Sequence, residues 1–341
     1  MALRILFPDA RFENAPDIER AVAGPDAELV IHDAKSAAEI PDDVWASADA
    51  IMFYNTVLAS DAVAAKAAKC RIVVRCGVGY DKIDVQAFGR RGIPVCNTPD
   101  YGTTDVADMA VAMLLAFARG VVGYNEALKQ DPVGNWHWNR AVPGVRRLRG
   151  ATLGVVGLGR IGTAAALRAR AFGMDVAFYD PHLPNGTELA LGFRRYRSLN
   201  ELLAASDAVT IHCPLTEETR GLIGEAAIAA MKPGALLINT ARGPICDLHP
   251  IEQALRSGKL AGVGLDVLPV EPPSAEDPLI AAWRRDEPWI RGRLILAPHA
   301  AFYSADAFAD MRRLSMETAI RYLREGLLQN CVNLPWLKRN A

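Results

Sequence analysis

The sequence lacks the features that mark several large classes of protein. Its six cysteines form no CxxC pair and stand beside no cluster of histidines, which argues against a structural zinc site and against a disulfide framework. Its formal net charge of −1 offers no electrostatic basis for binding nucleic acid or an anionic membrane. The apolar stretch from Ala107 to Ala118 is too short to cross a bilayer and indicates a buried helix.

The N-terminus also lacks a basic segment followed by a long apolar one, so we expect no signal peptide. Several cysteines stand in apolar, strand-like runs, as small buried hydrophobic residues do. We therefore expect a cytoplasmic protein with reduced thiols and no bound metal, and neither nucleic acid nor membrane as a partner.

Short apolar runs alternate with helical patterns along most of the 341 residues, as in parallel α/β proteins. This length suits two domains of ordinary size. The predicted fold is α/β, with two parallel-sheet domains that are Rossmann-like or flavodoxin-like. The simplest arrangement inserts a nucleotide domain, residues 103–302, into a discontinuous substrate domain made of residues 1–102 and 303–341.

Residues 153–180 carry the most informative pattern. An apolar run leads into a glycine turn, an alanine-rich helix and a second apolar run that ends on an acidic residue, which is the order of a dinucleotide-binding βαβ unit. Gly157 allows the tight turn, Gly159 lets the main chain approach a pyrophosphate, and Gly162 lets the helix pack closely on the strand. The predicted cofactor loop is Gly157, Leu158, Gly159, Arg160, Ile161 and Gly162.

Asp180 ends the second apolar run and selects between the two nicotinamide dinucleotides. A carboxylate accepts hydrogen bonds from the adenosine ribose hydroxyls but repels a 2′-phosphate. The next residues, Pro181, His182 and Leu183, include no arginine to offset that repulsion. The predicted cofactor is therefore NAD, not NADP.

Three chargeable residues follow predicted strands of the nucleotide domain: Arg242, Glu271 and His299. An arginine can grip a carboxylate and polarise a carbonyl, a histidine can donate a proton, and a carboxylate can orient that histidine. Each also has an ordinary interpretation, as a surface arginine, a turn residue or a core histidine. Their joint position at strand ends beside an NAD fold favours reduction of a 2-oxo acid.

A second glycine turn, residues 75–81, lacks the third glycine of a dinucleotide loop. Its main-chain amides could hold a smaller anion such as a carboxylate. A turn that binds no ligand explains the same residues equally well.

Taken together, these motifs resemble the D-isomer-specific 2-hydroxyacid dehydrogenase family over essentially the full length. The matching stretches are 75–84, 97–108, 148–180, 212–215, 231–243, 264–272 and 297–304. The resemblance implies that Arg242, Glu271 and His299 are catalytic and that the Val78 and Gly79 amides meet the substrate carboxylate. It further implies NAD contacts at Cys213, Pro214, Thr219, Thr240, Ala241 and Asp266, and a homodimer formed through the helix from Thr104 and the arm of residues 121–150.

Within the family, residues 75–79, 179–183 and 299–304 look most like the branch that contains the eukaryotic C-terminal-binding co-repressors. That likeness implies a second carboxylate-binding arginine at Arg75 and a substrate contact at Phe302. Two stretches depart from the family pattern: residues 243–250, and a long segment between Glu271 and His299 that could be a lid or a subunit contact.

The predicted function is reversible hydride transfer between NAD(H) and a small 2-oxo or 2-hydroxy acid. An NAD(H)-sensing co-repressor-like scaffold without turnover is the alternative from another class. Formate oxidation needs no acid–base pair, so Glu271 argues against it, whereas phosphite oxidation stays open.

Overall fold

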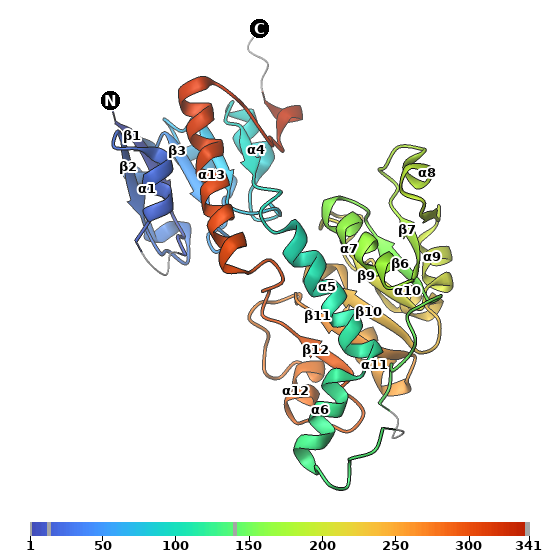
Figure 1. The fold of residues 1–341 in the computed structure, drawn as a ribbon. Coiled ribbons are helices and arrows are strands. Elements are labelled where there is room, and N and C mark those ends of the chain that lie inside the picture. Colours follow the sequence, from blue (N-terminus) through green and yellow to red (C-terminus); the bar gives the residue numbers. More distant parts are fainter. Residues whose placement is uncertain (1, 12–14, 139–141, 338–341) are drawn as a thin grey trace. The chain divides into compact units, whose positions relative to one another are not determined.

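The computed structural model describes residues 2–11, 15–138 and 142–337. The chain divides into two compact units, which Figure 1 draws as ribbons. Unit 1 comprises residues 1–102 and 303–341, and unit 2 comprises residues 103–302. Each unit is built on its own parallel sheet.

Unit 1 has a five-stranded sheet in the order β2-β1-β3-β4-β5, with every neighbouring pair parallel. This is the flavodoxin-like order. The strands are β1 (Leu3–Phe7), β2 (Ala27–Ile31), β3 (Ala50–Phe53), β4 (Ile72–Arg75) and β5 (Val95–Asn97). The helices are α1 (Asp17–Ala23), α2 (Asp42–Ser47), α3 (Asp61–Lys66), α4 (Val85–Arg90) and α13 (Ala305–Glu325), with short 3₁₀ turns η1 (Ala37–Glu39) and η3 (Leu334–Trp336).

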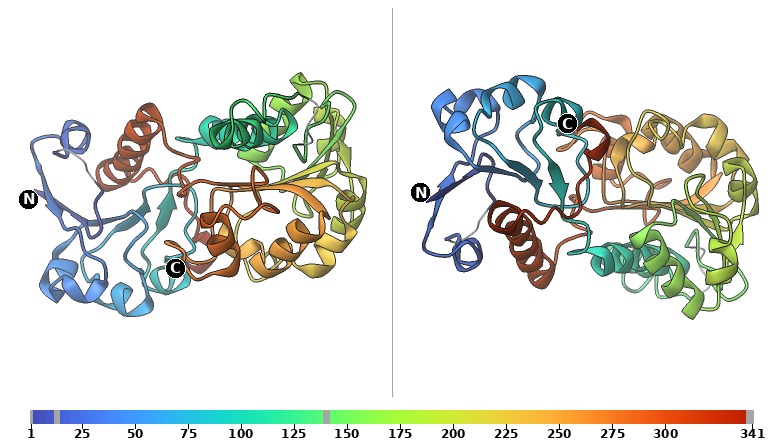
Figure 2. Two further views of the ribbon diagram at one scale, coloured as in Figure 1. Left: turned by 90° about the horizontal axis from the view of Figure 1, so that it is seen from below. Right: turned by 90° about the horizontal axis from the view of Figure 1, so that it is seen from above.

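The strands of unit 1 are apolar on both faces because helices cover both (Figure 2). Ile5 and Phe7 of β1 pack with Met316 of α13 on one face. Leu6, between them, points to the other face and packs with Trp45 of α2 and Phe88 of α4. Successive residues of one strand are thus buried on opposite faces of the sheet, which explains why the sequence shows continuous apolar runs.

Unit 2 has a seven-stranded sheet in the order β12-β11-β10-β9-β6-β7-β8. Read from β8, six of these strands follow the Rossmann order, and β12 adds a seventh. The strands are β6 (Thr152–Val156), β7 (Asp175–Tyr179), β8 (Arg194–Arg195), β9 (Ala208–Ile211), β10 (Ala235–Asn239), β11 (Leu260–Leu265) and β12 (Leu294–Leu296). The predicted α/β class, with one Rossmann-like and one flavodoxin-like sheet, is confirmed.

Helices again cover both faces of this sheet. On one face α5 and α7 pack together, and on the other α9, α10, α11 and α12 surround a core that includes Val209, Leu237 and Val263. The helices of unit 2 are α5 (Thr103–Ala118), α6 (Val121–Gln130), α7 (Arg160–Ala171), α8 (Thr187–Leu191), α9 (Leu199–Ala205), α10 (Glu225–Ala230), α11 (Leu248–Ser257) and α12 (Pro278–Arg284), with the 3₁₀ turn η2 (Gly243–Ile245).

Two segments have more structure than the sequence indicated. The predicted irregular arm of residues 121–150 begins with the helix α6, which starts after Gly120 in the left-handed conformation. In the segment between Glu271 and His299, Asp277 caps α12 by accepting from the amides of Leu279 and Ile280. Leu279 and Ile280 are buried in the core of unit 2, so α12 is a packed part of that unit.

Among the described residues, no single helix has the length and hydropathy to cross a bilayer. The pair α5 and α6 passes the same test only when the two are joined across a bend of 56°.

Candidate active site

The glycine loop after β6 has the shape that a dinucleotide requires. Gly157 has a φ of +86°, and a Cβ there would lie 2.6 Å from the main-chain nitrogen of Cys213. A Cβ at Gly162 would collide with the carbonyl oxygen of Gly157. At Gly159, by contrast, a Cβ would meet only open space, which is where a pyrophosphate would approach the main chain. The twelve-residue helix α7 begins immediately after Gly159, so its first N–H groups face this space.

Asp180 lies beside this loop at the end of β7. Its Oδ2 accepts a hydrogen bond of 2.9 Å from the amide of Leu158, and its Oδ1 accepts one of 3.0 Å from the amide of His182. Each oxygen retains capacity for a further donor, as a ribose hydroxyl would require. The carboxylate is therefore fixed next to the glycine loop in an orientation that suits an adenosine ribose.

Arg195 of β8 holds the chain that follows Asp180, a role that the sequence did not indicate. Its guanidinium donates to the carbonyl oxygens of Asp180 and Leu183, both at 2.8 Å, and to that of Pro184 at 2.9 Å. Its side chain is only 4% exposed. The terminal nitrogens of this arginine are occupied by these carbonyls and by Glu188 Oε2 at 3.5 Å, so their role is to hold the loop that follows Asp180.

The loops after β9 and β10 contain two buried polar atoms that have no partner among the residues the structure describes. They are Nδ1 of His212, whose Nε2 bonds Thr210, and Oγ1 of Thr240. Burial lowers the pKa of His212 to about 4, so its ring is neutral near pH 7. Buried polar atoms normally find partners. Their position at the carboxyl end of the sheet is consistent with a bound dinucleotide supplying them.

The other predicted cofactor residues lie on the same loops. Thr219 closes the turn after β9, because its hydroxyl donates to the carbonyl of Pro214 at 2.7 Å. The amide of Cys213 lies against Gly157, and that of Ala241 donates to Asn239 Oδ1 at 2.9 Å. The residues of unit 2 described here thus fit a nicotinamide dinucleotide from its adenosine end to the carboxyl ends of β10 and β11.

Glu271 and His299 are brought together, as predicted. His299 Nδ1 lies 2.7 Å from Glu271 Oε2, and Glu271 Oε1 accepts a hydrogen bond of 2.9 Å from the amide of Leu268. Burial would raise the pKa of Glu271, but the bonds from His299 and Leu268 and the charges of His299 and Arg242 lower it below its usual value. The carboxylate therefore stays ionised and accepts a proton-bearing Nδ1, which leaves Nε2 of the ring for a reacting group.

Asp266 positions the loop that carries His299. Its main-chain oxygen accepts from the His299 amide at 2.8 Å, and its Oδ1 accepts from the amides of Ala300 and Ala301 at 2.8 and 3.0 Å. Burial is the main reason why the pKa of Asp266 is raised above its usual value. The resemblance placed Asp266 against the cofactor, whereas the structure shows a second task, support of the histidine loop.

Phe302 lies beside the catalytic candidates, with its ring edge-on to His299 at 6.5 Å between centroids. Arg242 stands directly before η2 and donates to the carbonyl of Ala241 at 2.8 Å. The proline and cysteine that depart from the family pattern, Pro244 and Cys246, lie in and just after this 3₁₀ turn and leave the arginine at the end of the β10 loop.

The other predicted substrate residues, Arg75, Val78 and Gly79, belong to unit 1 and follow β4. Arg75 folds back over Gly77, to the carbonyl of Cys76. The loop is held from β5: the side-chain amide of Asn97 donates to the Val78 carbonyl at 2.7 Å, and the Thr98 amide donates to the Gly77 carbonyl at 3.0 Å. It is thus an anchored loop at the carboxyl end of the sheet, where ligands of open α/β sheets bind.

Comparison with known proteins agrees with this geometry. The model of the D-isomer-specific 2-hydroxyacid dehydrogenase NAD-binding domain matches residues 111–301. A glyoxylate reductase of Korarchaeum cryptofilum is 40% identical over 269 residues, which are 78% of this chain and 77% of that protein. A D-3-phosphoglycerate dehydrogenase of Methanocaldococcus jannaschii is 34% identical over 98% of this chain, which spans only 60% of that protein. The crystal structure of a glyoxylate reductase from Paecilomyes thermophila has a TM-score of 0.84 at 27% identity and covers 97% of this chain and 98% of its own.

Proposed function

Because this chain belongs to the D-isomer-specific 2-hydroxyacid dehydrogenase family and is an NAD-dependent oxidoreductase, we propose that Arg242, Glu271 and His299 catalyse reduction of a small 2-oxo acid at the carboxyl edge of the unit 2 sheet. The observation that carries this proposal is the 2.7 Å contact between His299 Nδ1 and Glu271 Oε2. With Nδ1 bonded to Glu271, the other ring nitrogen can act on the substrate. A protonated Nε2 is the general acid for reduction, and a neutral Nε2 is the base for oxidation in the reverse direction.

Bound NADH supplies the hydride in this reaction. His299 donates the Nε2 proton to the carbonyl oxygen of the substrate, so that the alkoxide charge never develops fully. Glu271 keeps the ring in the tautomer with Nδ1–H and stabilises the charged ring. Because the pKa of Glu271 is lowered, the carboxylate performs this role throughout the neutral range.

Arg242 provides the second half of the chemistry. Its guanidinium is planar and always charged, so it can bind one carboxylate oxygen and the carbonyl oxygen of a 2-oxo acid with two parallel donors. This geometry polarises the carbonyl and aligns its carbon for hydride attack. We also propose that Arg75 and the amides of Val78 and Gly79, which belong to unit 1, bind the substrate carboxylate, and that Phe302 of unit 2 contacts the substrate side chain.

The test is a panel of substrates, with each reaction monitored through the disappearance of NADH. We expect turnover of at least one among glyoxylate, hydroxypyruvate, pyruvate, phenylpyruvate and 2-oxoisocaproate, and a loss of roughly 100- to 10,000-fold in His299→Ala. Phosphite with NAD is the control for the alternative dehydrogenation. The proposal fails if no 2-oxo acid is reduced or if His299→Ala matches the parent.

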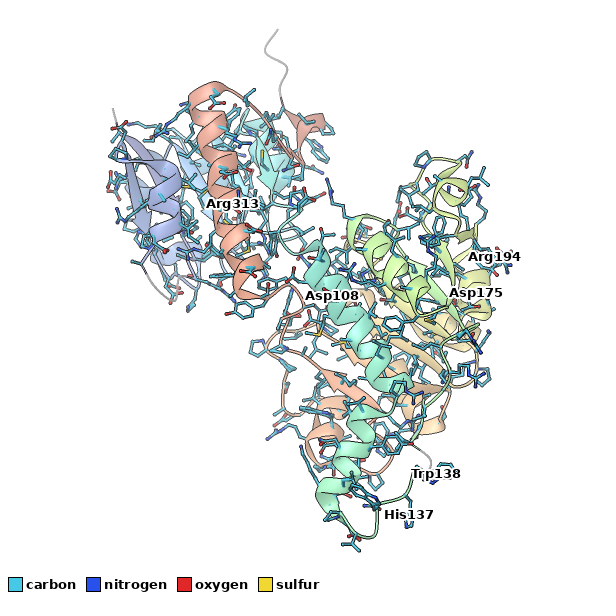
Figure 3. The ribbon with its side chains drawn as sticks, in the orientation of Figure 1. Asp108, His137, Trp138, Asp175, Arg194 and Arg313 are labelled. Carbon is cyan, nitrogen blue, oxygen red and sulfur yellow. The ribbon has the colours of Figure 1, made fainter. Side chains whose placement is uncertain are left out.

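A scaffold without turnover is not favoured, because the acid–base pair is assembled. We further propose a cytoplasmic homodimer formed through α5 and the arm of residues 121–150. In that arm Trp136 and Trp138 are 75% and 88% exposed, more than large apolar side chains usually are in a monomer, and Figure 3 labels Trp138 beside His137. Light scattering measures the oligomeric state of the parent and of a Trp136→Ser/Trp138→Ser variant. A monomeric parent would refute the homodimer.

A further inference from the structure

Two cysteines of unit 1 face each other at the junction between β5 and the segment after α13. Cys96 and Cys331 pair on an isolated antiparallel bridge. On one side of the pair the Asn97 amide donates to the Asn330 carbonyl at 3.1 Å, and on the other the Val332 amide donates to the Val95 carbonyl at 2.8 Å. The cysteines are therefore a non-hydrogen-bonded pair, whose Cα atoms are typically about 4.5 Å apart. That spacing is within the range of disulfides, roughly 4.4–6.8 Å.

A buried asparagine keeps the two cysteines in this register. Asn333 is fully buried, and its side chain accepts from the Val95 amide at 2.8 Å and donates to the carbonyls of Val85 and Ile93 at 3.1 and 3.0 Å. These three side-chain bonds tie the segment after α13 to β5, to Ile93 shortly before that strand and to the start of α4, in addition to the bridge. Cys331 cannot slide along β5 without breaking them.

The two thiols differ from each other in exposure and in the direction of their pKa shifts. Cys96 is buried and Cys331 is partly exposed. The contact between the two thiols lowers the pKa of Cys331 and, together with burial, raises that of Cys96, while the Cys331 thiol also donates to Asn333 Oδ1 at 3.2 Å. Burial raises the pKa of Cys70 and that of Cys76 to about 12. Since the thiolate is the reactive form, Cys331 should react first and Cys96 is in place to resolve the product.

The residues directly after Cys96 hold the candidate carboxylate loop. Asn97 donates to the Val78 carbonyl at 2.7 Å, and the Thr98 hydroxyl donates to the Arg75 carbonyl at 3.2 Å. A disulfide needs its Cβ atoms about 3.8 Å apart, whereas facing residues of a non-hydrogen-bonded pair have theirs roughly 4.5 Å apart, the short end of the usual range. Closing the bond therefore pulls β5 and the segment after α13 together next to Asn97.

We propose that Cys96 and Cys331 are a redox pair whose disulfide displaces the loop of residues 75–79 and weakens binding of the 2-oxo acid. With hydrogen peroxide as oxidant, the Cys331 thiolate attacks one oxygen and releases hydroxide, giving a sulfenic acid. The Cys96 thiol then attacks that sulfur and water leaves, so two thiols and one peroxide become one disulfide and two waters. A dithiol reverses the step. The effect on substrate binding rests on the proposed function, whereas formation of the bond does not.

The experiment treats the whole protein with hydrogen peroxide and maps its cysteine peptides without reduction. We expect a Cys96–Cys331 cross-link, a mass lower by two hydrogens, and reversal by dithiothreitol. The cross-link must be absent in Cys331→Ser and present in Cys70→Ser, a control that removes a buried thiol of the same unit. Recovery of both cysteines as free thiols after oxidation, or their pairing with other cysteines, would overturn the site whether or not the protein is an active dehydrogenase.

Kinetics of the oxidised protein test the second half of the proposal. We expect the KM for the best 2-oxo acid to rise severalfold and to return to its starting value on reduction. The KM for NADH should not change, because the dinucleotide residues all lie in unit 2. Cys331→Ser should show neither change after peroxide. A cross-linked protein with an unaltered KM for the acid would overturn the coupling to the substrate loop and leave the redox pair established.

Discussion

Two hydrogen bonds restrain His299 in an unusual backbone conformation. Its main chain has a φ of 54°, a left-handed conformation that costs a non-glycine residue about 1–2 kcal/mol. Its amide is bonded to Asp266, and its Nδ1 is bonded to Glu271. Positive φ at a candidate catalytic residue indicates strain that the surrounding bonds maintain, here those of Asp266 to residues 299–301.

Replacement of Glu271 tests this arrangement. In Glu271→Gln the side chain remains nearly isosteric but loses the charge that stabilises the protonated ring. We expect kcat to fall roughly 100-fold or more, with little change in the unfolding free energy, because Glu271 is partly exposed. Steady-state kinetics and thermal unfolding measure both quantities. Glu276→Gln, an exposed change in the same segment, is the matched control and should behave as the parent.

His212 should make stability sensitive to acid. Its folded pKa of about 4 lies below the unfolded value of roughly 6.5. Above pH 6.5 both states are neutral and the residue contributes nothing. As the pH falls from about 6.5 to 4 only the unfolded state takes up the proton, so stability falls by up to about 3 kcal/mol.

The measurement is urea unfolding of the cofactor-free protein at several pH values. His212→Gln should lose less stability on acidification than the parent, whereas His249→Gln, which removes an exposed histidine, should follow the parent curve. Identical slopes for the parent and His212→Gln would show that burial of this ring does not govern the acid response.

At the scale of elements, the short strand β8 matters more than its length suggests. Through Arg195 it supports the chain from Asp180 to Pro184, which begins with the residue proposed to select the cofactor. Its neighbour on the strand, Arg194, is exposed and is labelled together with Asp175 of β7 in Figure 3. Alternation along the strand thus exposes one of two adjacent arginines and turns the other toward the loop after Asp180.

Arg195→Met keeps the length of the side chain and removes its donors. The carbonyls of Asp180 and Leu183 then lose this donor, that of Pro184 keeps only the Thr187 hydroxyl, and the loop no longer holds Asp180 in place. We expect the KM for NADH to rise about tenfold, the equivalent of one charged hydrogen bond, with kcat little changed. Arg194→Met should leave both constants unaltered. An equal rise in the two variants would assign the effect to net charge instead of to loop support.

At the scale of the whole molecule, each unit has its own sheet and its own cores on both faces. The glycine loop, Asp180 and the loops after β9, β10 and β11 all belong to unit 2. The cofactor should therefore stabilise the molecule by binding the folded form of that unit.

We expect NADH at about 100 times its Kd to add roughly 2.7 kcal/mol to the unfolding free energy. NADPH at the same concentration should add far less, because Asp180 would repel its 2′-phosphate. Thermal unfolding with each nucleotide measures the difference, and AMP serves as a control that lacks the nicotinamide. Equal stabilisation by NADH and NADPH would contradict the role of Asp180.

The sequence alone was sufficient for the α/β class, the family and the NAD loop. These depend on local rules: apolar runs form buried strands, and Gly157 and Gly162 stand where a Cβ would collide with the main chain. The structure added α6, whose start after a left-handed Gly120 lay inside a stretch without clear periodicity, and α12, whose burial depends on the core of unit 2.

Contacts between distant residues were decided only by the tertiary structure. Glu271 and His299 were both named from their strand ends, but their bond exists because β11 and β12 are neighbours in one sheet. Arg195 under Asp180 and Cys331 opposite Cys96 had no signal in the sequence, because each depends on the register between segments that only folding brings together. Side-chain type and spacing thus determined which chemistry is present, and packing of the sheets determined which groups act on one another.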